Sequence, residues 1–460
     1  MFKSVNKIHF VGIGGIGMSG IAEVLLNSGF LVSGSDMTES VNTEYLTGLG
    51  IEIFIGHDKK NIRGADVVVY SSAIDILENP ETLEARLHNI PILRRAEMLA
   101  EVARLNYSVA ISGTHGKTTT TSMLGLILIK AGIDPTVIVG GRLKDFGGTN
   151  ARLGKGEWTV VEADEYDRSF LQLTPTIAVI NNVEAEHMDV YRDIDDVEST
   201  FAEFGNKVPF YGFVALGLDD DGAKNVLARI NKKVITYGFS RNCDLRGEAV
   251  EYNNEFIVCR VYEQDVMLGN LELRIPGEHN LQNALAAVTV ARSLDVKFST
   301  IAEALKEFAG VYRRFETKGI YHDAVVIDDY AHHPTEVKAT LEGAASFFDG
   351  RIICLFQPHT FSRTRDQYKE FAKSFGGADV LIVMDIYAAR EKPIEGIEGK
   401  MIADSARDFG HKNVHFTPDS EKALQKVKEI LRPGDVLITM GAGDVWKIGE
   451  ELVSENNNNK

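Results

Sequence analysis

Short apolar runs alternate with amphipathic stretches along the first hundred residues. Four runs have the length and apolar content of buried strands: Ile8–Val11, Phe30–Ser33, Ile51–Ile55 and Val67–Tyr70. After the first of them, the apolar residues of Met18–Asn27 recur at helical spacing. Strands that alternate with helices over short connections predict a parallel sheet with helices on both faces.

A second stretch repeats the alternation. It predicts a strand over Val109–Ser112, a helix over Thr119–Lys130 and a later helix over Leu281–Ser293. Its other strands are predicted over Trp158–Val161, Ile177–Ile180, Val214–Leu216 and Val234–Tyr237. The alternating residues of 243–275 predict antiparallel strands that extend the same sheet.

A third stretch begins near Val311 and has the same organisation. Its buried-strand runs are Val325–Asp328, Ile352–Phe356, Val380–Met384 and Val436–Met440. The chain is therefore predicted to be an α/β protein of three domains, over 1–105, 106–312 and 313–460. The polar, Asn-rich tail at 454–460 predicts disorder.

Composition narrows the class of protein. The 460 residues are 44% hydrophobic and 25% charged, which is globular usage and excludes a disordered or fibrous chain. No apolar run reaches the ~18 residues of a membrane span, and the N-terminus lacks the pattern of a signal peptide. A net charge of −17 argues against a nucleic-acid partner but allows phosphorylated small molecules. Three scattered cysteines give no disulfide framework, which fits a reducing cytoplasm.

The first motif that carries chemistry is Gly12–Gly17, a G-x-G-x-x-G loop between a predicted strand and a predicted helix. Such a loop offers N–H groups and a helix N-terminus to a diphosphate. Asp36 lies where an acid can bind a ribose hydroxyl. The usual ligand is a dinucleotide such as NAD, although a nucleotide sugar fits equally well; a glycine turn without a ligand is the plain alternative.

The second motif is Gly113–Thr120, again between a strand and a helix. Its G-x-x-G-K-T spacing is two residues shorter than the common P-loop. The mechanics are the same: backbone N–H groups surround phosphates, Lys117 reaches the terminal phosphates, and Thr118 can bind Mg²⁺. A turn with a surface lysine is the alternative.

Two acidic segments follow strands of the same predicted sheet. Glu162 begins the segment Glu162–Glu165, at the strand end where a Mg²⁺-binding acid lies beside a P-loop. His187 lies in the acidic segment Glu184–Asp189, which suggests a metal ligand or a phosphate contact. A solvated acidic loop and a structural histidine are the alternatives.

Two later segments complete the candidate chemistry. Asn280 and Asn283 lie at a helix start, three residues apart and so on one face, where their amides can contact a purine; Asn280 can also be only an N-cap. Asp328–Thr335, with Arg313–Phe315 before it, has the acids and histidines of an active-site loop. Spacing places no third ligand for an isolated zinc site there.

In this order, the motifs resemble those of the Mur ligases, ATP-dependent amide-forming enzymes of peptidoglycan precursor synthesis. Val11–Ser19, Ser71–Ile74 and Arg95–Leu99 are similar to the branch that joins L-alanine to UDP-N-acetylmuramate. The resemblance implies a UDP-binding Rossmann-like domain, a central P-loop ATPase α/β domain and a C-terminal Rossmann-like domain that closes over the site. One departure is Glu186 before His187, where the family usually has aspartate.

The resemblance also implies which residues form the sites. The UDP part would be held by Gly14, Gly15, Ile16, Gly17, Met18, Ser19, Asp36, His57, Ser71 and Ser72. ATP would be held by Gly113, Thr114, His115, Gly116, Lys117, Thr118, Thr119, Asn280, Asn283, Arg314 and Asp329. Mg²⁺ would be bound by Thr118, Glu162 and His187. Catalysis would depend on Lys117, Glu162, His187, Arg314 and Asp329.

The implied reaction activates the lactyl carboxylate of the sugar as an acyl phosphate, which the amine of L-alanine then attacks. The implied cofactors are ATP and Mg²⁺, in a cytoplasmic monomer or homodimer without a membrane or nucleic-acid partner. Three alternatives stay open: a ligase that recycles murein peptides, an NAD-dependent oxidoreductase that uses only the first motif, and a catalytically inactive UDP-sugar or ATP sensor.

Overall fold

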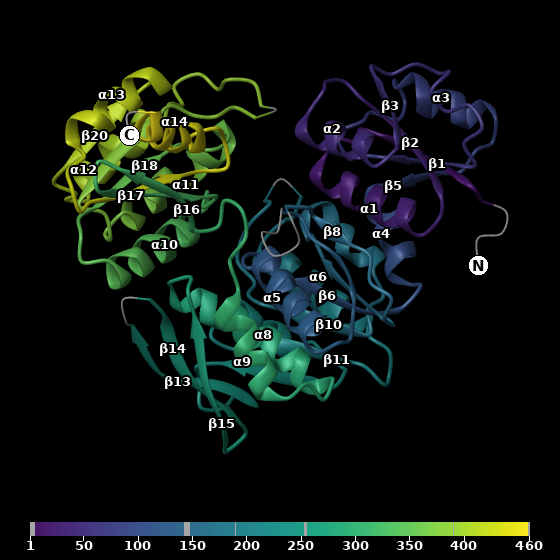
Figure 1. Ribbon diagram of the computed structural model, residues 1–460, viewed down its shortest axis with the longest axis horizontal. Coiled ribbons are helices and arrows are strands. Elements are labelled where there is room, and N and C mark those ends of the chain that lie inside the picture. The colour runs from purple at the N-terminus through teal and green to yellow at the C-terminus, as the bar shows by residue number, and fades with distance from the viewer. Residues whose placement is uncertain (1–4, 142–147, 189, 253–254, 390, 459–460) are drawn as a thin grey trace. The chain divides into compact units, whose positions relative to one another are not determined.

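The computed structural model describes residues 5–141, 148–188, 190–252, 255–389 and 391–458. The chain divides into two compact units. One consists of Met1–Glu248, Arg260–Asn270 and Gln282–Phe308, and the other of Ala249–Cys259, Leu271–Leu281 and Ala309–Lys460. The described residues form three sheets of mainly parallel strands (Figure 1). The prediction of three α/β domains is confirmed, while their exact borders stay a prediction.

The first sheet has five strands in the order β3-β2-β1-β4-β5. They are β1 (Lys7–Val11), β2 (Leu31–Asp36), β3 (Glu52–Ile55), β4 (Val67–Tyr70) and β5 (Ile92–Arg94), and all neighbours are parallel. Its helices are α1 (Ile16–Asn27), α2 (Val41–Gly48), α3 (Pro80–Leu87) and α4 (Arg95–Ala103). Because β1 is central, both faces of it are covered, and Ile8, Phe10 and Val11 are buried.

The second sheet has ten strands in the order β15-β14-β13-β12-β11-β10-β6-β9-β7-β8. In chain order they are β6 (Tyr107–Ser112), β7 (Thr136–Ile138), β8 (Ala151–Arg152), β9 (Trp158–Glu162), β10 (Ile177–Ile180), β11 (Phe213–Gly217), β12 (Val234–Gly238), β13 (Leu245–Tyr252), β14 (Ile257–Glu263) and β15 (Val266–Leu273). The helical elements are α5 (Lys117–Lys130), the 3₁₀ segment η2 (Tyr166–Gln172), α6 (Ile194–Asn206), α7 (Asp221–Leu227), α8 (Glu278–Ser293) and α9 (Phe298–Glu307). The segment 243–275 extends the sheet, as predicted, but its first strand, β13, pairs with β12 in parallel and not in the predicted antiparallel direction.

The third sheet has six strands in the order β16-β17-β21-β18-β19-β20. They are β16 (Glu316–Tyr321), β17 (Ala324–Asp329), β18 (Ile352–Phe356), β19 (Val380–Met384), β20 (Val414–Thr417) and β21 (Val436–Met440). Only the β16–β17 pair is antiparallel among them. Its helices are α10 (Pro334–Phe347), α11 (Phe361–Ser374), α12 (Lys400–Asp408), α13 (Ser420–Ile430) and α14 (Trp446–Asn458).

Strands that are apolar throughout match the prediction residue for residue, as at Val67–Tyr70 and Val380–Met384. The second strand differs from its predicted range, Phe30–Ser33, because β2 runs from Leu31 to Asp36. Its polar residues Ser33 and Ser35 are fully buried. The prediction of a disordered tail is wrong up to Asn458, which ends α14. There the Asn456 amide donates to Ile320 O at 3.0 Å and ties the tail to β16.

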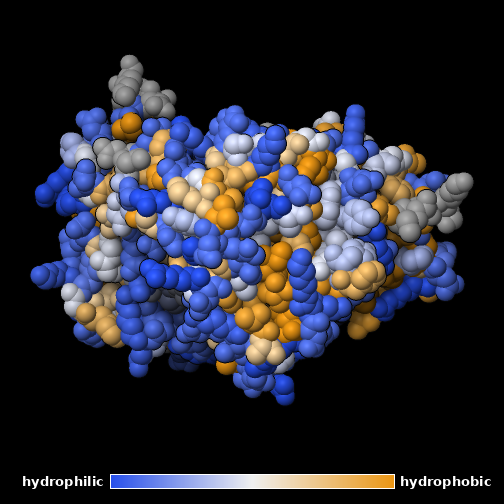
Figure 2. Space-filling view, turned by 90° about the horizontal axis from the view of Figure 1, so that it is seen from below, coloured by the Kyte–Doolittle hydropathy of each residue, from blue (hydrophilic) through white to orange (hydrophobic). Residues whose placement is uncertain are grey.

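Hydrophilic side chains predominate on the face shown in Figure 2, and hydrophobic ones form patches between them. Among the described residues, no helix combines the length and the apolar character that a membrane crossing requires.

Candidate nucleotide and substrate sites

The first glycine loop connects β1 to α1 and lies on the end of β2. The N–H groups of Gly12 and Ile13 donate to Ser35 O at 2.8 and 3.0 Å. The N–H of Gly14 donates to a carboxylate oxygen of Asp36 at 2.8 Å. The loop and the predicted ribose-binding acid are therefore in direct contact, in the strand–loop–helix context that the motif requires.

Two further residues, Ser71 and Arg95, border this loop. Ser71 N donates to Val11 O at 3.1 Å, which places Ser71 beside Gly12. Gly17 packs against the Arg95 guanidinium so closely that a Cβ on Gly17 would lie 2.9 Å from Nη1. Arg95 Nη2 is also 3.8 Å from Asp164. The sequence indicates Arg95 only as part of the motif Arg95–Leu99, whereas its contact with the loop makes it a candidate binding residue.

Other residues predicted for the first site differ in how they are presented. His57 follows β3, and its Nδ1 is 3.0 Å from Ser35 Oγ. Ser72 is exposed beside Ser71. Met18 and Ser19 have buried side chains, and their N–H groups donate to Gly15 O. The structure therefore does not present these two residues at the open side of the loop.

The second glycine loop connects β6 to α5 and closes around its own lysine. Lys117 Nζ donates to Gly113 O at 2.7 Å and to Thr114 O at 3.1 Å. Gly116 has φ +81°, and a Cβ there would lie 2.1 Å from Asn283 Oδ1, so the position requires glycine. The predicted P-loop geometry of strand, tight loop and helix is present.

Lys117 also forms a buried ion pair that the sequence did not predict. Its Nζ lies 2.8 and 2.9 Å from the two carboxylate oxygens of Glu165, whose side chain is 4% exposed. Burial raises the pKa of Glu165 to about 7, which Lys117 opposes and Asp164 reinforces. Burial would lower the pKa of Lys117, but the carboxylates of Glu165, Asp164 and Glu162 outweigh it and raise that pKa. Lys117 is thus a fully charged cation.

Thr118 and Glu162 form a second polar contact at the loop. Thr118 Oγ1 donates to the Glu162 carboxylate, with distances of 3.1 and 3.0 Å to its two oxygens. Gly140 N donates to the same carboxylate at 2.7 Å. A hydroxyl and a carboxylate side by side are hard oxygen ligands of the kind that Mg²⁺ prefers.

His187 belongs to a neighbouring group. Its Nε2 is 3.7 Å from Glu165 Oε1, and its ring meets the edge of Tyr166 with centroids 5.1 Å apart. Glu165, Glu186 and His187 offer ligand atoms within 4.8 Å of one another. The predicted metal residues therefore fall into two groups, Thr118 with Glu162 and His187 with Glu165 and Glu186, and Lys117 contacts the second group through Glu165.

The loop after β10 braces the second glycine loop. Asn182 Oδ1 accepts from His115 N at 2.7 Å, and Asn182 O accepts from Thr114 N at 3.1 Å. Glu184 N donates to Thr114 Oγ1 at 2.8 Å. His115 and Thr114 are held by main-chain and amide contacts of this segment, which fixes the shape of the loop.

Asn280 and Asn283 lie in the first turns of α8. Asn283 Oδ1 accepts from Thr120 Oγ1 at 3.3 Å, so this amide contacts the second glycine loop. Asn280 Nδ2 donates to Pro276 O at 2.7 Å. Since α8 begins at Glu278, Asn280 lies inside the helix and is not its N-cap.

In the other compact unit, two adjacent arginines have different surroundings. Arg313 Nε donates to Asp328 at 3.0 Å and its Nη2 donates to Gly441 O at 2.7 Å. The Arg314 Nη1 is 3.7 Å from Glu336, and the Arg314 guanidinium lies over the Tyr330 ring at 5.3 Å. Arg313 thus ties Asp328 to the main chain after β21, whereas the Arg314 guanidinium lies between the Tyr330 ring and the Glu336 carboxylate.

Asp329 ends β17 as a buried carboxyl. It accepts from Phe315 N and Ala331 N, each at 2.7 Å. Burial raises the pKa of Asp329 to about 6, although Arg314 and these two N–H groups oppose the shift. Asp329 therefore organises the loop that carries Arg314.

Two aromatic residues that the sequence did not single out lie near His332. The rings of His332 and His359 have centroids 5.9 Å apart, and His359 stacks on Tyr387 at 5.8 Å. Burial and then His332 lower the pKa of His359 to about 4. Like His332, His359 follows the end of a central strand, here β18, and that position is the sequence signal that was available.

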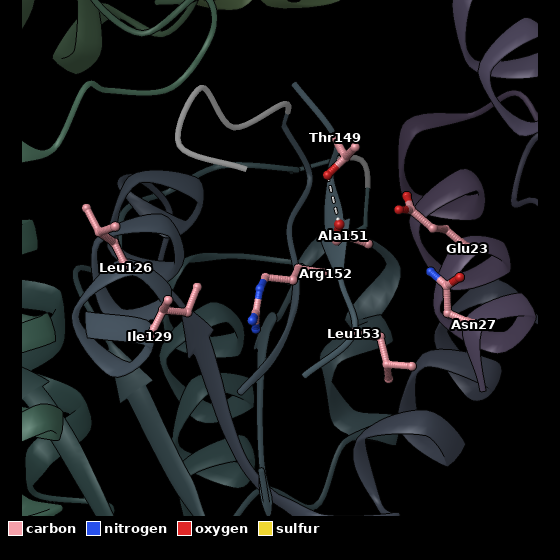
Figure 3. Close-up of a pocket in the computed structure, with 8 residues that line it drawn as sticks. All are labelled: Glu23, Asn27, Leu126, Ile129, Thr149, Ala151, Arg152 and Leu153. Carbon is pink, nitrogen blue, oxygen red and sulfur yellow. Dashed lines mark hydrogen bonds between the residues drawn. The ribbon is translucent and has the colours of Figure 1, made fainter. Parts of the chain in front are cut away.

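A cavity of about 520 Å³ in the first unit contains none of the predicted site residues (Figure 3). Its lining comes from α1, α5 and the segment around β8: Glu23, Asn27, Leu126, Ile129, Thr149, Ala151, Arg152 and Leu153. In Figure 3 the Glu23 carboxyl and the Asn27 amide point from α1 toward that segment. The cavity is separate from both glycine loops.

Three family descriptions match consecutive parts of the chain. Residues 7–107 match "Mur ligase family, catalytic domain", residues 111–291 match "Mur ligase middle domain", and residues 313–443 match "Mur ligase, glutamate ligase domain". Together they cover most of the sequence in the order in which the three sheets occur.

Individual relatives are similar over the full length. The UDP-N-acetylmuramate–L-alanine ligases of Geotalea uraniireducens (strain Rf4) and Syntrophotalea carbinolica are each 50% identical to this chain. The first match covers 99% of both chains, and the second covers 98% of both. The crystal structure of the UDP-N-acetylmuramate–alanine ligase of Thermotoga maritima is 30% identical, with a TM-score of 0.83 over 99% of this chain and 100% of that one. A murein peptide ligase from Psychrobacter arcticus 273-4, at 24% identity and a TM-score of 0.70 over 98% and 99%, shares the fold.

Proposed function

Because the chain belongs to the Mur ligase family, we propose that it joins L-alanine to the lactyl carboxylate of UDP-N-acetylmuramate, with ATP converted to ADP and phosphate. This is a step of peptidoglycan precursor synthesis. The observation that carries the proposal is the 50% identity to L-alanine ligases over 99% of both chains. The two glycine loops support it, since the reaction needs one site for a nucleotide sugar and one for ATP.

We assign Mg²⁺ to the second loop because the donor set there fits it. Thr118 and Glu162 bring a hydroxyl and a carboxylate together, and His187 lies with two more carboxylates in the neighbouring group. A bound Mg²⁺ would supply positive charge to the phosphate oxygens of ATP. Gly140 N, which donates to Glu162, holds that carboxylate in place.

The chemistry of the chain's own residues follows from charge. A carboxylate that attacks the γ-phosphorus of ATP brings two anions together, so the site must supply cations. Lys117 is one, held by its loop and by Glu165. A phosphate that enters the loop competes with Glu165 for Lys117, and the pKa of about 7 lets Glu165 accept a proton when it loses that partner. Arg314 is the proposed second cation.

The proposed second step is attack of the alanine amine on the acyl phosphate, with phosphate as leaving group. It needs no nucleophilic side chain. The three cysteines are buried and free, and burial raises the pKa of Cys243 and Cys259 to about 12 and raises that of Cys354 as well. None of them forms a thiolate near neutral pH, so catalysis consists of positioning and charge stabilisation.

The test is alanine-dependent phosphate release. The protein is incubated with UDP-N-acetylmuramate, ATP and Mg²⁺ and with each amino acid or a murein tripeptide in turn, and the product mass is recorded. We expect turnover with L-alanine and a product larger by one alanine residue. Turnover with the tripeptide alone would establish the recycling ligase instead. NADH that binds at micromolar concentration, where UDP-N-acetylmuramate does not, would favour the oxidoreductase.

The domain borders 1–105, 106–312 and 313–460 are part of this proposal, as are a monomer or homodimer and a cytoplasmic location, where ATP and nucleotide sugars are available. The roles assigned to the remaining predicted residues are proposals of the same kind. Limited proteolysis at the two borders and sedimentation of the purified protein test the organisation.

A further inference from the structure

A buried carboxylate lies behind the first glycine loop. Glu81, the second residue of α3, is 0% exposed. Its Oε2 accepts from Ser35 Oγ at 2.6 Å and lies 3.4 Å from His9 Nε2 and 3.6 Å from His57 Nδ1. Its Oε1 accepts from Asn61 Nδ2 at 2.6 Å and from Asp58 N at 3.3 Å. None of the reactions described above uses this group.

Glu81 is ionised although no lysine or arginine is among these contacts. A buried carboxylate is costly unless hydrogen bonds or opposite charges compensate it. Burial would raise the pKa of Glu81, but hydrogen bonds from His9, Ser35 and Asn61 outweigh it and hold the pKa below its usual value. His9 is held between two partners: its Nε2 faces Glu81, and its Nδ1 lies 2.9 Å from Ser33 Oγ.

This arrangement fixes where the protons of His57 lie. Ser35 has one hydroxyl proton and gives it to Glu81. Toward His57, Ser35 Oγ is therefore an acceptor, and His57 Nδ1 carries a proton. A neutral His57 then has no proton on Nε2. That atom is buried and has no hydrogen-bond partner among the described residues.

The same serine connects the ring to the glycine loop. Ser35 O accepts from Gly12 N and Ile13 N, and Ser35 Oγ accepts from His57. His57 also follows Gly56, whose N–H donates to Asp36 O at 2.8 Å. The unpartnered Nε2 thus belongs to the cluster of strand ends that carries the loop.

We propose that Glu81 is a positioning residue of the diphosphate site: through Ser35 it fixes the tautomer of His57, so that the ring binds an anionic diphosphate as an imidazolium and takes up one proton when the ligand binds. The proposal rests on the proposed function, in which this loop binds a nucleoside diphosphate sugar. The proton comes from solvent and bonds to Nε2, while the Nδ1 proton stays on His57 and keeps its hydrogen bond to Ser35 Oγ. The negative charge of Glu81, 3.6 Å from Nδ1, balances the ring's charge.

The other titratable groups around the ring are few among the described residues. His9 faces Glu81 from β1, Asp36 ends β2, and Asp58 follows His57 in the chain. Asp36 is the competing site of proton uptake, because it is a carboxylate in contact with the loop that would receive the diphosphate.

The test is calorimetric titration of the full-length protein with UDP in PIPES, HEPES and Tris at about pH 7.5, which lies above the ordinary titration range of a free imidazole. The dependence of the binding enthalpy on the ionisation enthalpy of the buffer gives the number of protons taken up. We expect about one proton per UDP for the wild type. Glu81→Gln and Ser35→Ala should lose most of the uptake and weaken UDP binding about tenfold.

Controls separate positioning from folding and from the competing acid. Glu84→Gln lies on the same helix and removes only an exposed contact with His88, so it should keep both affinity and uptake. Asp36→Asn should bind UDP less tightly but still take up the proton. Thermal melts verify that each variant is folded. If Glu81→Gln does not fold, Ser35→Ala, which keeps the buried carboxylate, tests the proposal alone.

Three outcomes would overturn the inference. They are UDP binding by the wild type without proton uptake, uptake that persists in folded Ser35→Ala, and uptake lost only in Asp36→Asn. Alanine-dependent phosphate release is measured on the same preparation. If the wild type is active but takes up no proton when UDP binds, only this inference is wrong. If the wild type neither binds UDP nor releases phosphate, the proposed function is wrong as well.

Discussion

The two glycine loops have the same backbone plan and different charges around it. Each leaves a strand of a parallel sheet and opens a helix, β1 to α1 and β6 to α5. The first loop carries no charged residue of its own and is bordered by Asp36 and Arg95. The second contains Lys117, enclosed by Glu165 and its neighbours. In the proposed function the backbone of each loop binds phosphate, and the lysine of the second loop distinguishes the site that reacts from the site that only binds.

Buried carboxylates extend this comparison. Around Glu81, hydrogen bonds from His9, Ser35 and Asn61 outweigh burial and lower the pKa of the carboxyl. Around Glu165 and Asp329, burial prevails and raises the pKa to about 7 and about 6. The difference lies in the number of hydrogen bonds that each carboxylate receives and in nearby acids: Asp164 raises the pKa of Glu165, and Glu336 raises that of Asp329.

The largest effect is expected when the lysine of the second loop is removed. Lys117→Ala should lower alanine-dependent phosphate release about 10³-fold, because the charge that faces the phosphates is removed. UDP binding, measured by calorimetry, should stay within twofold. Lys130→Ala, at the other end of α5 and paired with Glu307, is the matched control. Turnover within tenfold of the wild type would remove the P-loop assignment.

The next effect concerns the adjacent arginines. Arg314→Ala should lower kcat by about 10²–10³ while UDP affinity changes little, since the lost guanidinium stabilises charge only during phosphoryl transfer. Arg313→Ala should instead lower Tm, because it leaves buried Asp328 without its ion pair. Steady-state kinetics and thermal melts of both variants distinguish a role in catalysis from a role in stability. An unchanged kcat in Arg314→Ala would exclude that residue from the site.

A pH series sharpens the comparison of buried carboxylates. The folded pKa of Asp329 is raised from 3.8 to about 6, so its contribution to stability is present below 3.8 and is lost as pH rises through 6. Relative to Asp329→Asn, the wild type should lose about 2 kcal/mol of unfolding free energy between about pH 4 and about pH 7.

Glu81 should show the opposite sign. Its folded pKa is lowered from 4.5, so its contribution is present above 4.5 and is lost as pH falls below that value. Urea unfolding of the wild type and of Asp329→Asn and Glu81→Gln, from well below pH 4.5 up to about pH 7, measures both slopes. If the unfolding free energy changed with pH in the same direction for both residues, the distinction between the surroundings of Asp329 and of Glu81 would be wrong.

The smallest effect is confined to the first loop. A Cβ on Gly14 would lie 2.9 Å from a carboxylate oxygen of Asp36, so Gly14→Ala should displace that side chain and weaken UDP binding about tenfold, with kcat at saturation unchanged. Gly48→Ala, where a Cβ meets nothing within 4 Å, is the control. An equal loss of kcat would mean that the first loop takes part in the chemistry.

The sequence by itself determined the strands that are apolar throughout and both glycine loops. It also located candidate residues such as Asp36, Glu162 and Asp329, because in parallel sheets ligand sites lie at the carboxyl ends of strands. These features are local: a buried run, a turn and the residue after it are adjacent in the chain, so a short window of sequence contains them.

Only the tertiary structure decided which charges meet. Glu81 follows Asn79 and Pro80 in a helix N-terminal turn, where an acid usually serves the helix dipole at the surface, yet it accepts from Ser35 across 46 residues. Glu165 was one of several acids after β9, and its pairing with Lys117 spans 48 residues. The predicted strand stopped at Ser33, whereas β2 continues through Ser35 to Asp36, and both serines are buried because such partners satisfy them. The burial and ionisation of a polar group depend on neighbours distant in sequence, which local patterns do not specify.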